Sequence, residues 1–583
     1  MLFQSYRPIF SLTIYIVLVF LFIAAIAFSI LFSKELTAAL GIFSFSIVIR
    51  LMYYVSTGFS VLPYGDPYSQ YSVLQAFSES SHVAIFPVAN FLNFLTRIPH
   101  QYSEWPGLEA FSVSLSRITN LPIFWTALIV PFILYGVWFV VSYAVVRRIF
   151  AKFAGRTAST LSLLTMAVAI ALPTFELPPI FKYDFMATVL LLAIILLLIY
   201  SYGGQIVAKS LLFLLLVAAI MVTHSLTALF LVILMTLLGM AYVIRALIPM
   251  LLPRFKGFWI FKGSSATKRI SFPRLIIFVM ACVAAWWTYY ATFILTYAGK
   301  GSQFLLGSFS LQFLSFSRIG ARKASVIASL TPSWLIQVLH YRDELLLGLV
   351  ALGTLVLVIR PTIVGKRLLV TAILLSIGVV TLLTEALRTL NFGDRAFPTF
   401  APILACFVVI PVAAIATWKP NLAKIGGILI VVIFLFSVAL GFWGSSYAPV
   451  YLYSKNASAY AFGEHPTNWQ QVANYMNYGI STTNSSNPSC ILTNEIYVTS
   501  LVVPVKELGI TYPFTDIRTR PGCVVIIYDG LSHFNYSSVS EPYVPYSNSS
   551  FLPAFSDAAF SNTLSNRSDL VFDGGNATIY YVY

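Results

Sequence analysis

The stretch IFSLTIYIVLVFLFIAAIAFSILF, residues 9–32, runs for 24 residues without a charged side chain. A helix that crosses the hydrocarbon core of a membrane needs about 20 apolar residues. The run is longer than the apolar core of a secretory signal peptide, and no small-residue cleavage site preceded by a basic stretch is evident. We therefore expect an uncleaved membrane helix at residues 9–32.

The rest of the chain repeats this pattern. It is 59% hydrophobic and 9% charged, whereas a soluble domain carries about 25% charged residues, so a soluble protein is excluded. We expect a polytopic α-helical membrane protein with about 11–13 transmembrane helices. The candidate spans are 9–32, 36–55, 121–146, 157–174, 185–201, 206–222, 225–245, 275–298, 344–359, 367–385, 396–416 and 424–443. The stretch 304–340 is either a further span or a surface segment.

Basic residues predict the orientation of these spans. Residues 1–443 hold 30 Lys and Arg against 11 Asp and Glu, and the tail 444–583 holds 5 against 9, for a net charge of +15. The positive-inside rule places the basic loops in the cytoplasm; these are 147–156, 245–274, 360–367 and 417–424. Because the basic residues flank membrane spans, nucleic acid is not an expected partner. Twelve spans put both termini outside, whereas Arg7 favours an inside start, and a thirteenth span or a hairpin at 33–55 would resolve this conflict.

The acidic residues favour the opposite face. Ten of the 11 acids before residue 444 lie in or beside the loops predicted to face outward, which are 56–120, 174–184, 299–343 and 385–395. Glu35 is the exception. Carboxylates near a bilayer are costly and usually functional. Ten that face one way therefore suggest a polar, catalytic cleft on the outer face.

The tail 444–583 is expected to be a small extracellular α/β domain that follows the transmembrane domain 1–443. All six Asn-x-Ser/Thr sequons lie in it, and such acceptors mark an exported surface; they are Asn456, Asn484, Asn535, Asn548, Asn566 and Asn576. We expect helices at 467–478 and 495–508, strands at 489–492 and 523–528, and a hairpin that joins 570–573 to 577–582. In an oxidising compartment, Cys490 and Cys523 either form a disulfide or stay as two buried thiols.

The first outward loop, 56–120, is unusually long and contains Asp66 and Glu104. Asp66 lies just beyond a predicted helix end, where a carboxylate can face both water and a substrate at membrane depth. Such a group acts as a general base or as a metal ligand, although Asp before Pro67 is also typical of a turn.

The second outward loop, residues 175–184, reads FELPPIFKYD and carries Glu176 and Asp184. Both carboxylates can converge with Asp66 on one cleft. Asp184 is also well placed to cap the helix that follows it. Asp66 and Asp184 are the candidate ligands for a divalent cation, Mg²⁺ or Mn²⁺.

Three residues that could bind a phosphate come after Asp184 in the sequence. His224 is a candidate for binding a lipid phosphate or a carboxylate, or else an interfacial His that caps a short turn. The last outward loop, residues 385–395, reads EALRTLNFGDR, and its Arg388 and Arg395 can grip a phosphate through bidentate contacts. Snorkelling or a local network with carboxylates is the alternative for this pair. Glu385 and Glu104 are candidates for contacts to an acceptor.

These motifs together resemble the GT-C class of polytopic glycosyltransferases, especially its archaeal members. The resemblance rests on Gly65-Asp66-Pro67-Tyr68, YSEWPGLE at 102–109, Glu176 and Asp184, THSLTA at 223–228, the outward Arg pair and VFDGGNATIY at 571–580. It implies a sugar donor carried on a polyprenyl (dolichyl) phosphate or pyrophosphate, inverting transfer, Asp66 as the first-loop acid, Glu176 and Asp184 as the second acidic site, and Arg388 or Arg395 as phosphate binder. The tail lacks the Trp-Trp-Asp-Tyr-Gly motif of oligosaccharyltransferases, so transfer of a whole glycan to asparagine is not expected.

The leading hypothesis is therefore a cell-membrane glycosyltransferase whose partners are membrane lipids, a polyprenyl-phosphate-linked sugar, and a glycan or protein acceptor. A glycan polymerase or ligase is a related alternative. A transporter or flippase of lipid-linked sugars would carry charges at mid-membrane depth in broken helices. A non-catalytic surface glycoprotein would leave the asymmetry of the acids unexplained.

Overall fold

The computed structural model describes most of the helical part of the chain and five strands of the tail. The described residues are 12–32, 34–56, 70–71, 73–74, 77–78, 105–153, 155–172, 181–200, 206–251, 272–289, 333–364, 370–378, 393–442, 490–493, 511–513, 523–528, 568–573 and 577–582.

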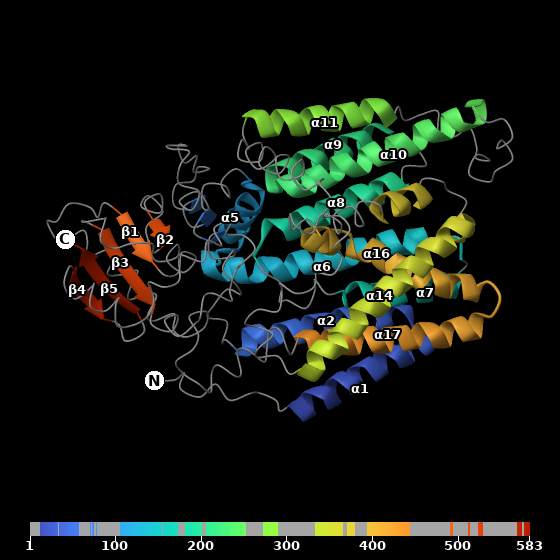
Figure 1. Ribbon diagram of the computed structural model, residues 1–583, viewed down its shortest axis with the longest axis horizontal. Helices are drawn as coiled ribbons and strands as arrows, with labels where there is room; N and C mark the ends of the chain where they lie inside the picture. Colours follow the sequence, from blue (N-terminus) through green and yellow to red (C-terminus); the bar gives the residue numbers. More distant parts are fainter. Residues whose placement is uncertain are drawn as a thin grey trace, which may run out of the picture.

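Long helices make up the described part of residues 1–443 (Figure 1). They are α1 (Leu12–Leu31), α2 (Glu35–Ser56), α5 (Gly107–Thr119), α6 (Ile123–Ile149), α7 (Gly155–Ala169), α8 (Tyr183–Tyr200), α9 (Ile206–Thr223), α10 (Ser225–Leu251), α11 (Phe272–Tyr289), α14 (Ser333–Ile359), α16 (Gly393–Ala416) and α17 (Pro420–Phe442), with the short 3₁₀ helix η8 (Pro361–Val364).

Five of these helices are long and apolar enough to cross a membrane; they are Ile14–Leu31, Ile123–Ile149, Tyr183–Tyr200, Thr399–Ala416 and Pro420–Gly441. Shorter apolar helices fall at Ala208–Thr223, Ser225–Ala241, Ile277–Thr288 and Glu344–Ile359. The prediction of a membrane protein built from many apolar helices is thus confirmed in its main feature. The predicted break between two spans at Thr223-His224 also separates α9 from α10.

The structure adds detail to three predicted segments. The span predicted at 344–359 coincides with the apolar segment Glu344–Ile359. It belongs to a longer helix that begins at Ser333, because Arg342, Asp343 and Glu344 interrupt the hydropathy of this segment but not its helical backbone. The loop predicted at 385–395 ends earlier, since α16 begins at Gly393. The outward loop 56–120 contains the 13-residue helix α5, which is too short and too polar to have been predicted as a span.

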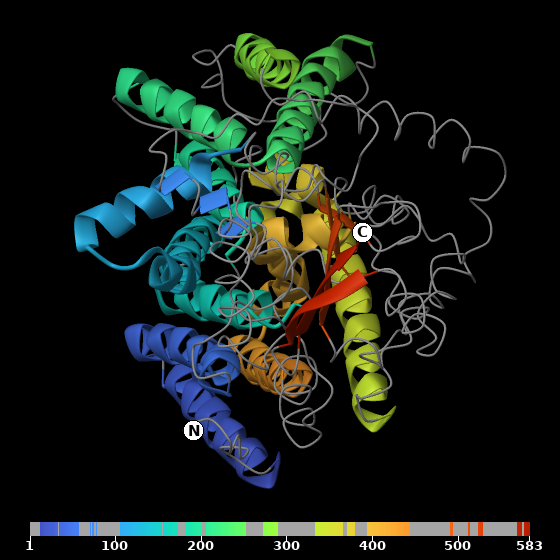
Figure 2. The same ribbon diagram turned by 90° about the vertical axis from the view of Figure 1, so that its left-hand side faces the viewer.

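The helices alternate in direction between two ends of the bundle, and the sheet of the tail lies beyond one of them (Figures 1 and 2). We call this the sheet end; α2 ends there, and α6, α8, α10 and α16 begin there. At the opposite end, the turns between consecutive helices carry Lys34, Lys152 and Lys419. We call this the basic end. It contains the segments that the positive-inside rule places in the cytoplasm.

Helix α16 forms the centre of the bundle. In its apolar window, Thr399–Ala416, 78% of the residues are buried, a larger share than in any of the other four long apolar helices. It packs against α14, α7 and α17. The closest approach is made by Gly353 of α14, where an added Cβ would lie 1.8 Å from the carbonyl oxygen of Phe407. Only glycine lets the two backbones meet this closely.

Replacing Gly353 with Ala is therefore expected to lower the melting temperature of the purified protein, because the obstructing atoms belong to the backbone of α16 and cannot rotate away. Gly348→Ala is the matched control, since an added Cβ at Gly348 on the same helix meets nothing within 4 Å. Because Ala favours a helix over Gly by about 0.5–1 kcal/mol, this control should melt at or above the wild-type temperature. Equal melting of the two variants in differential scanning fluorimetry would contradict the close approach.

The strands of the tail form one sheet in the order β2-β1-β3-β5-β4. Their bounds are β1 (Cys490–Thr493), β2 (Thr511–Pro513), β3 (Cys523–Tyr528), β4 (Ser568–Asp573) and β5 (Ala577–Val582). Strands β2, β1 and β3 are parallel, and β5 pairs antiparallel with both β3 and β4. The predicted strands and hairpin are confirmed, whereas β2 was not predicted. The helices predicted at 467–478 and 495–508 lie outside the described residues.

The register of β1 and β3 pairs Cys490 with Cys523. Neighbouring strands lie about 4.8 Å apart, which falls within the Cα–Cα range of about 4.4–6.8 Å that a disulfide spans. The test is to express the protein in cells that export it, unfold it without reductant, and alkylate its free thiols. Peptide mass spectrometry should then find Cys282 and Cys406 alkylated and Cys490 and Cys523 not alkylated. Labelling of all four thiols would show that the pair is reduced.

Candidate active site

The first turn of α8 lies at the sheet end and contains Asp184. A carboxylate in the first turn of a helix is stabilised by the positive end of the helix dipole. The backbone N–H of Tyr183 donates to Oε1 of Gln70 at 3.2 Å, which ties this turn to the first outward loop. The start of α8 is therefore held in place by Gln70, a residue of the first outward loop.

His224 lies beside Asp184. Its Nε2 is 3.0 Å from Oδ1 of Asp184, and the Nζ of Lys182 is 3.8 Å from Oδ2. The His224 side chain is 4% exposed and that of Asp184 is 26% exposed, so the carboxylate forms the more accessible part of the pair. Two residues that are 40 positions apart in the sequence and that were both predicted for the site are thus in contact.

The other ring nitrogen of His224 decides where the ring proton lies. Nδ1 accepts the backbone N–H of Thr227 at 3.3 Å and lies 2.8 Å from the Thr227 hydroxyl oxygen. A neutral imidazole whose Nδ1 accepts carries its proton on Nε2. The nitrogen of His224 that lies nearest Asp184 therefore carries the ring proton, and the contacts to Thr227 in the turn between α9 and α10 fix the orientation of the ring.

Aromatic rings enclose this pair. The ring centroid of Tyr183 lies 4.6 Å from that of His224 and 6.0 Å from that of Trp105. Next to Trp105, Gly107 opens α5 against the end of α9, where an added Cβ would lie 2.4 Å from the Thr223 hydroxyl oxygen. The WPG sequence of the first outward loop thus packs against the segment that carries His224.

Gln70, Trp105 and Glu109, at the sheet end, each have buried polar atoms that make no hydrogen bond with the described residues. The atoms concerned are Nε2 of Gln70, Nε1 of Trp105, and both carboxylate oxygens of Glu109. Burial raises the pKa of Glu109 from its ordinary value of 4.5 to about 8. Glu109 is therefore a neutral carboxylic acid at neutral pH, which can donate a hydrogen bond as well as accept one.

Glu109→Gln should remove a pH dependence of stability. Between pH 4.5 and about 8 the folded chain keeps a proton on Glu109 that the unfolded chain releases, so stability falls as the pH rises through this window. Gln is neutral throughout. We expect the melting temperature of Glu109→Gln to exceed that of the wild type increasingly as the pH rises toward 8, in fluorimetry of the detergent-purified protein.

The matched control is Glu344→Gln, which removes an exposed acid from α14. This variant should melt with the pH dependence of the wild type. The assignment of a neutral Glu109 would be wrong if Glu109→Gln and Glu344→Gln gave the same slope of melting temperature against pH.

Of the predicted site residues, Asp184 and His224 are described with their side chains. The backbone of Arg395 lies in the first turn of α16, at the sheet end. Outside the described residues lie Asp66, Glu104, Glu176, Glu385 and Arg388, as well as the six sequon asparagines. Their convergence with Asp184 stays a prediction. Among the described residues no group of three or more His, Cys, Asp or Glu side chains lies together, so Asp184 does not head a complete metal site there.

Arg50 is a buried charge that the sequence analysis passed over, although a single Arg inside the predicted span 36–55 was a readable signal. It is 1% exposed and donates to the Ser46 carbonyl at 2.9 Å and to the Ile170 carbonyl at 3.3 Å. Its guanidinium lies 5.2 Å from the ring centroid of Tyr135. Ile170 directly follows α7, whose last carbonyls lack helical partners. Arg50 therefore links α2, α6 and α7.

No protein-family model matches this chain, and no curated protein matches it in sequence. Solved structures do match. The archaeal oligosaccharyltransferase AglB from Archaeoglobus fulgidus, in complex with an inhibitory peptide and a dolichol-phosphate, is 11% identical with a TM-score of 0.47 over 86% of this chain and 70% of that chain. ArnT from Cupriavidus metallidurans, bound to undecaprenyl phosphate, is 11% identical with a TM-score of 0.42 over 94% of this chain and 97% of that chain.

Proposed function

We propose that this protein is a membrane glycosyltransferase that transfers a sugar from a polyprenyl (dolichyl) phosphate-linked donor to a glycan or protein acceptor on the outer face. The observation that carries this proposal is the contact of His224 Nε2 with Asp184 Oδ1, at 3.0 Å. The pair lies at the end of the bundle beyond which the sheet lies (Figure 1), and this is the end at which the sequence predicts the acids to gather. It combines a carboxylate with an N–H donor, which a phosphate-leaving reaction requires.

In the proposed reaction the acceptor hydroxyl oxygen attacks the anomeric carbon of the donor sugar. Asp66 takes the hydroxyl proton as general base. The bond from the anomeric carbon to the phosphate oxygen breaks, and its electron pair leaves with the lipid phosphate, so the anomeric configuration inverts. Arg388 and Arg395 stabilise the charge that develops on the phosphate. Asp184 holds the imidazole of His224, whose N–H supports the same charge.

Three further acids of the predicted outer face have supporting roles in this proposal. Glu176 joins Asp184 as the second acidic site, and Glu104 and Glu385 contact the acceptor. A divalent cation would take Asp66 and Asp184 as ligands, because Mg²⁺ and Mn²⁺ prefer carboxylate oxygen. When bound it would supply positive charge beside the leaving phosphate.

The proposed topology places residues 1–443 in the cell membrane and the sheet-containing tail, residues 444–583, outside. Support comes from the position of the sheet beyond the end opposite the basic turns and from the confinement of all six sequons to the tail. In this topology the six asparagines carry glycans, and Cys490 is bonded to Cys523.

The proposal is tested with the full-length protein, purified in detergent and supplied with radiolabelled dolichyl-phosphate mannose and dolichyl-phosphate glucose as donors. A glycan and glycoprotein extract from the expressing cells serves as acceptor. Since a general base contributes about 10²–10⁴-fold to rate, Asp66→Asn should lower kcat by at least about a hundredfold. Asp184→Asn should also lower kcat strongly, because it removes a proposed cation ligand as well as the partner of His224. His224→Gln should lose less activity, because Arg388 and Arg395 still bind the phosphate.

Glu344→Gln is the matched acid-to-amide control, because its carboxylate is exposed on α14 outside the proposed site. It should keep wild-type turnover. Full activity in Asp184→Asn, in protein that melts like the wild type, would refute the role of the Asp184–His224 pair. Release of free sugar in place of transfer would indicate a missing acceptor but would still show cleavage of the donor.

A transporter of lipid-linked sugars is the second candidate, because buried charges do lie within helices. Arg50 and Arg342 are 1% and 4% exposed. Both belong to continuous helices, α2 and α14, and Arg50 is held by backbone carbonyls. Neither residue lies in a broken helix, which favours the transferase. Movement of the lipid-linked sugar across a proteoliposome membrane without transfer would favour the transporter instead.

A further inference from the structure

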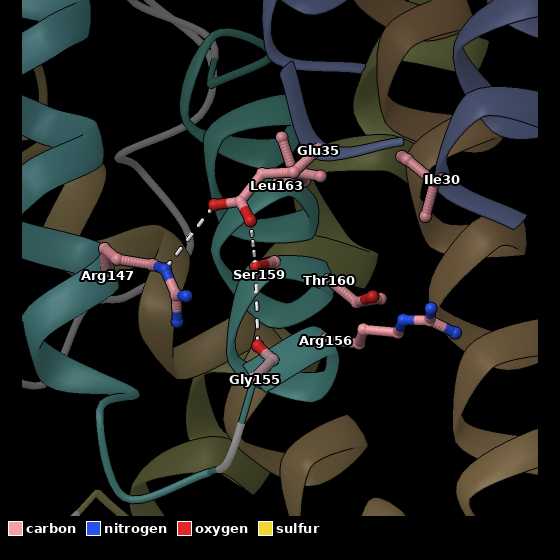
Figure 3. Close-up of a pocket in the computed structure, with 8 residues that line it drawn as sticks. All are labelled: Ile30, Glu35, Arg147, Gly155, Arg156, Ser159, Thr160 and Leu163. Carbon is pink, nitrogen blue, oxygen red and sulfur yellow. Dashed lines mark hydrogen bonds and ion pairs between the residues drawn. The ribbon is translucent and has the colours of Figure 1, made fainter. Parts of the chain in front are cut away.

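A cavity of about 220 Å³ with a mixed polar and apolar lining lies at the basic end of the bundle (Figure 3). The Asp184–His224 pair lies at the other end. It is bounded by the last turn of α1, the first residue of α2, the end of α6 and the start of α7. Ile30 and Leu163 line it with apolar surface and are 0% and 2% exposed. Charged and hydroxyl side chains complete the lining, among them Glu35, Arg147, Arg156 and Ser159.

Glu35 organises the polar side of this cavity. The Tyr143 hydroxyl donates to its Oε1 at 2.5 Å, and the Ser159 hydroxyl donates to its Oε2. The Nε of Arg147 is 3.5 Å from Oε1. Both carboxylate oxygens are thus engaged by α6 and α7. Figure 3 shows the terminal nitrogens of Arg147 directed away from Glu35. Glu35 therefore fixes Arg147 through its Nε and leaves the two terminal nitrogens of the guanidinium for another group.

The charge of the cavity is positive. Arg147 and Arg156 outnumber Glu35, and among the described side chains Arg156 has no carboxylate within ion-pair distance. Every other charged side chain described at this end is basic, and these are Lys34, Arg148, Lys152, Lys209, Arg360, Lys419 and Lys424. An anion is the ligand that such a set attracts, and guanidinium groups suit phosphate oxygens in particular.

The outer face of α1 at this end of the bundle is apolar. Phe28 and Phe32 are 63% and 57% exposed, and their ring centroids lie 4.3 Å apart. Leu31 is 43% exposed. Phe28 and Phe32 lie on the side of α1 opposite Ile30, which lines the cavity. A helix with an exposed apolar face in a membrane protein contacts lipid chains. The basic end therefore has cations for a head group in the cavity and apolar surface for hydrocarbon chains on the outer face of α1.

We propose that this cavity binds the phosphate head group of a membrane lipid at the cytoplasmic face, with Arg147 and Arg156 as its phosphate contacts. Glu35, the one acid of the transmembrane part outside the outward loops, is then a positioning residue that holds Arg147 and Ser159. Lipid bound here ties α1, α2, α6 and α7 together at the end opposite the proposed reaction. The inference concerns a second lipid site and does not depend on glycosyl transfer.

The test is native mass spectrometry of the full-length protein released from detergent. The probes are phosphatidylglycerol, the diacylglycerol with the same chains but no phosphate, and sodium phosphate alone. Wild-type protein should retain phosphatidylglycerol and not diacylglycerol. Arg156→Gln removes one charge-assisted contact and should lower phosphatidylglycerol occupancy about tenfold. Arg147→Gln should lower it similarly.

Lys419→Gln removes the same charge from an exposed position at the same end, outside the cavity, and should retain the lipid like the wild type. Because Arg156 is exposed, Arg156→Gln should melt like the wild type. Equal occupancy in Arg156→Gln and the wild type, or a parallel loss in Lys419→Gln, would overturn the proposal. So would stabilisation by sodium phosphate without retention of phosphatidylglycerol, since the ligand would then be the free anion.

Discussion

A charge inside an apolar helix bundle is stable only where other groups replace the water that it loses. Arg50 shows how this bundle meets the constraint. Its guanidinium donates to backbone carbonyls of Ser46 and Ile170 and lies over the ring of Tyr135, so helix ends and an aromatic face take the place of solvent. Most other charges avoid the requirement altogether, because they lie at one end of the bundle or the other. The separation of acids and bases along the sequence is a consequence of this constraint.

The cost of burying a charge also explains why Asp184 and Glu109, both at the sheet end, differ in their surroundings. Asp184 is partly exposed and lies beside His224 and Lys182, so its negative charge is compensated. Glu109 is fully buried, and no described group hydrogen-bonds its oxygens, so the proton stays on the carboxyl group and its pKa rises. An ionised and a neutral carboxyl group at one end of the bundle provide an acceptor and a donor of protons at neutral pH.

Sequence reasoning succeeded where one physical rule acts over many residues. Apolar length alone predicted α1, α2, α6 and α8 to within a few residues, and alternation with a Gly-Gly turn predicted the β4–β5 hairpin. It failed where charged residues lower the hydropathy of a segment that is nevertheless helical. In α14, Arg342, Asp343 and Glu344 lower hydropathy, yet charged residues with long side chains are good helix formers, so the helix continues through them. For the site, the sequence predicted that Asp184 and His224 lie on the same side of the membrane. It could not predict their contact, because the distance between them depends on the packing of α8 against α9 and α10.

Glu35 and Asp184 are two carboxylates in similar positions with different partners. Both lie at the start of a helix, where the dipole favours a carboxylate, so position on the helix does not distinguish them. Their partners do. The carboxylate of Glu35 is held by two hydroxyl groups and a guanidinium, which keep their protons at physiological pH. Asp184 contacts an imidazole and an amine and is partly exposed, so it lies where a substrate could reach it. The partners of Glu35 therefore fit a structural carboxylate, and those of Asp184 fit the role that the proposed reaction gives it.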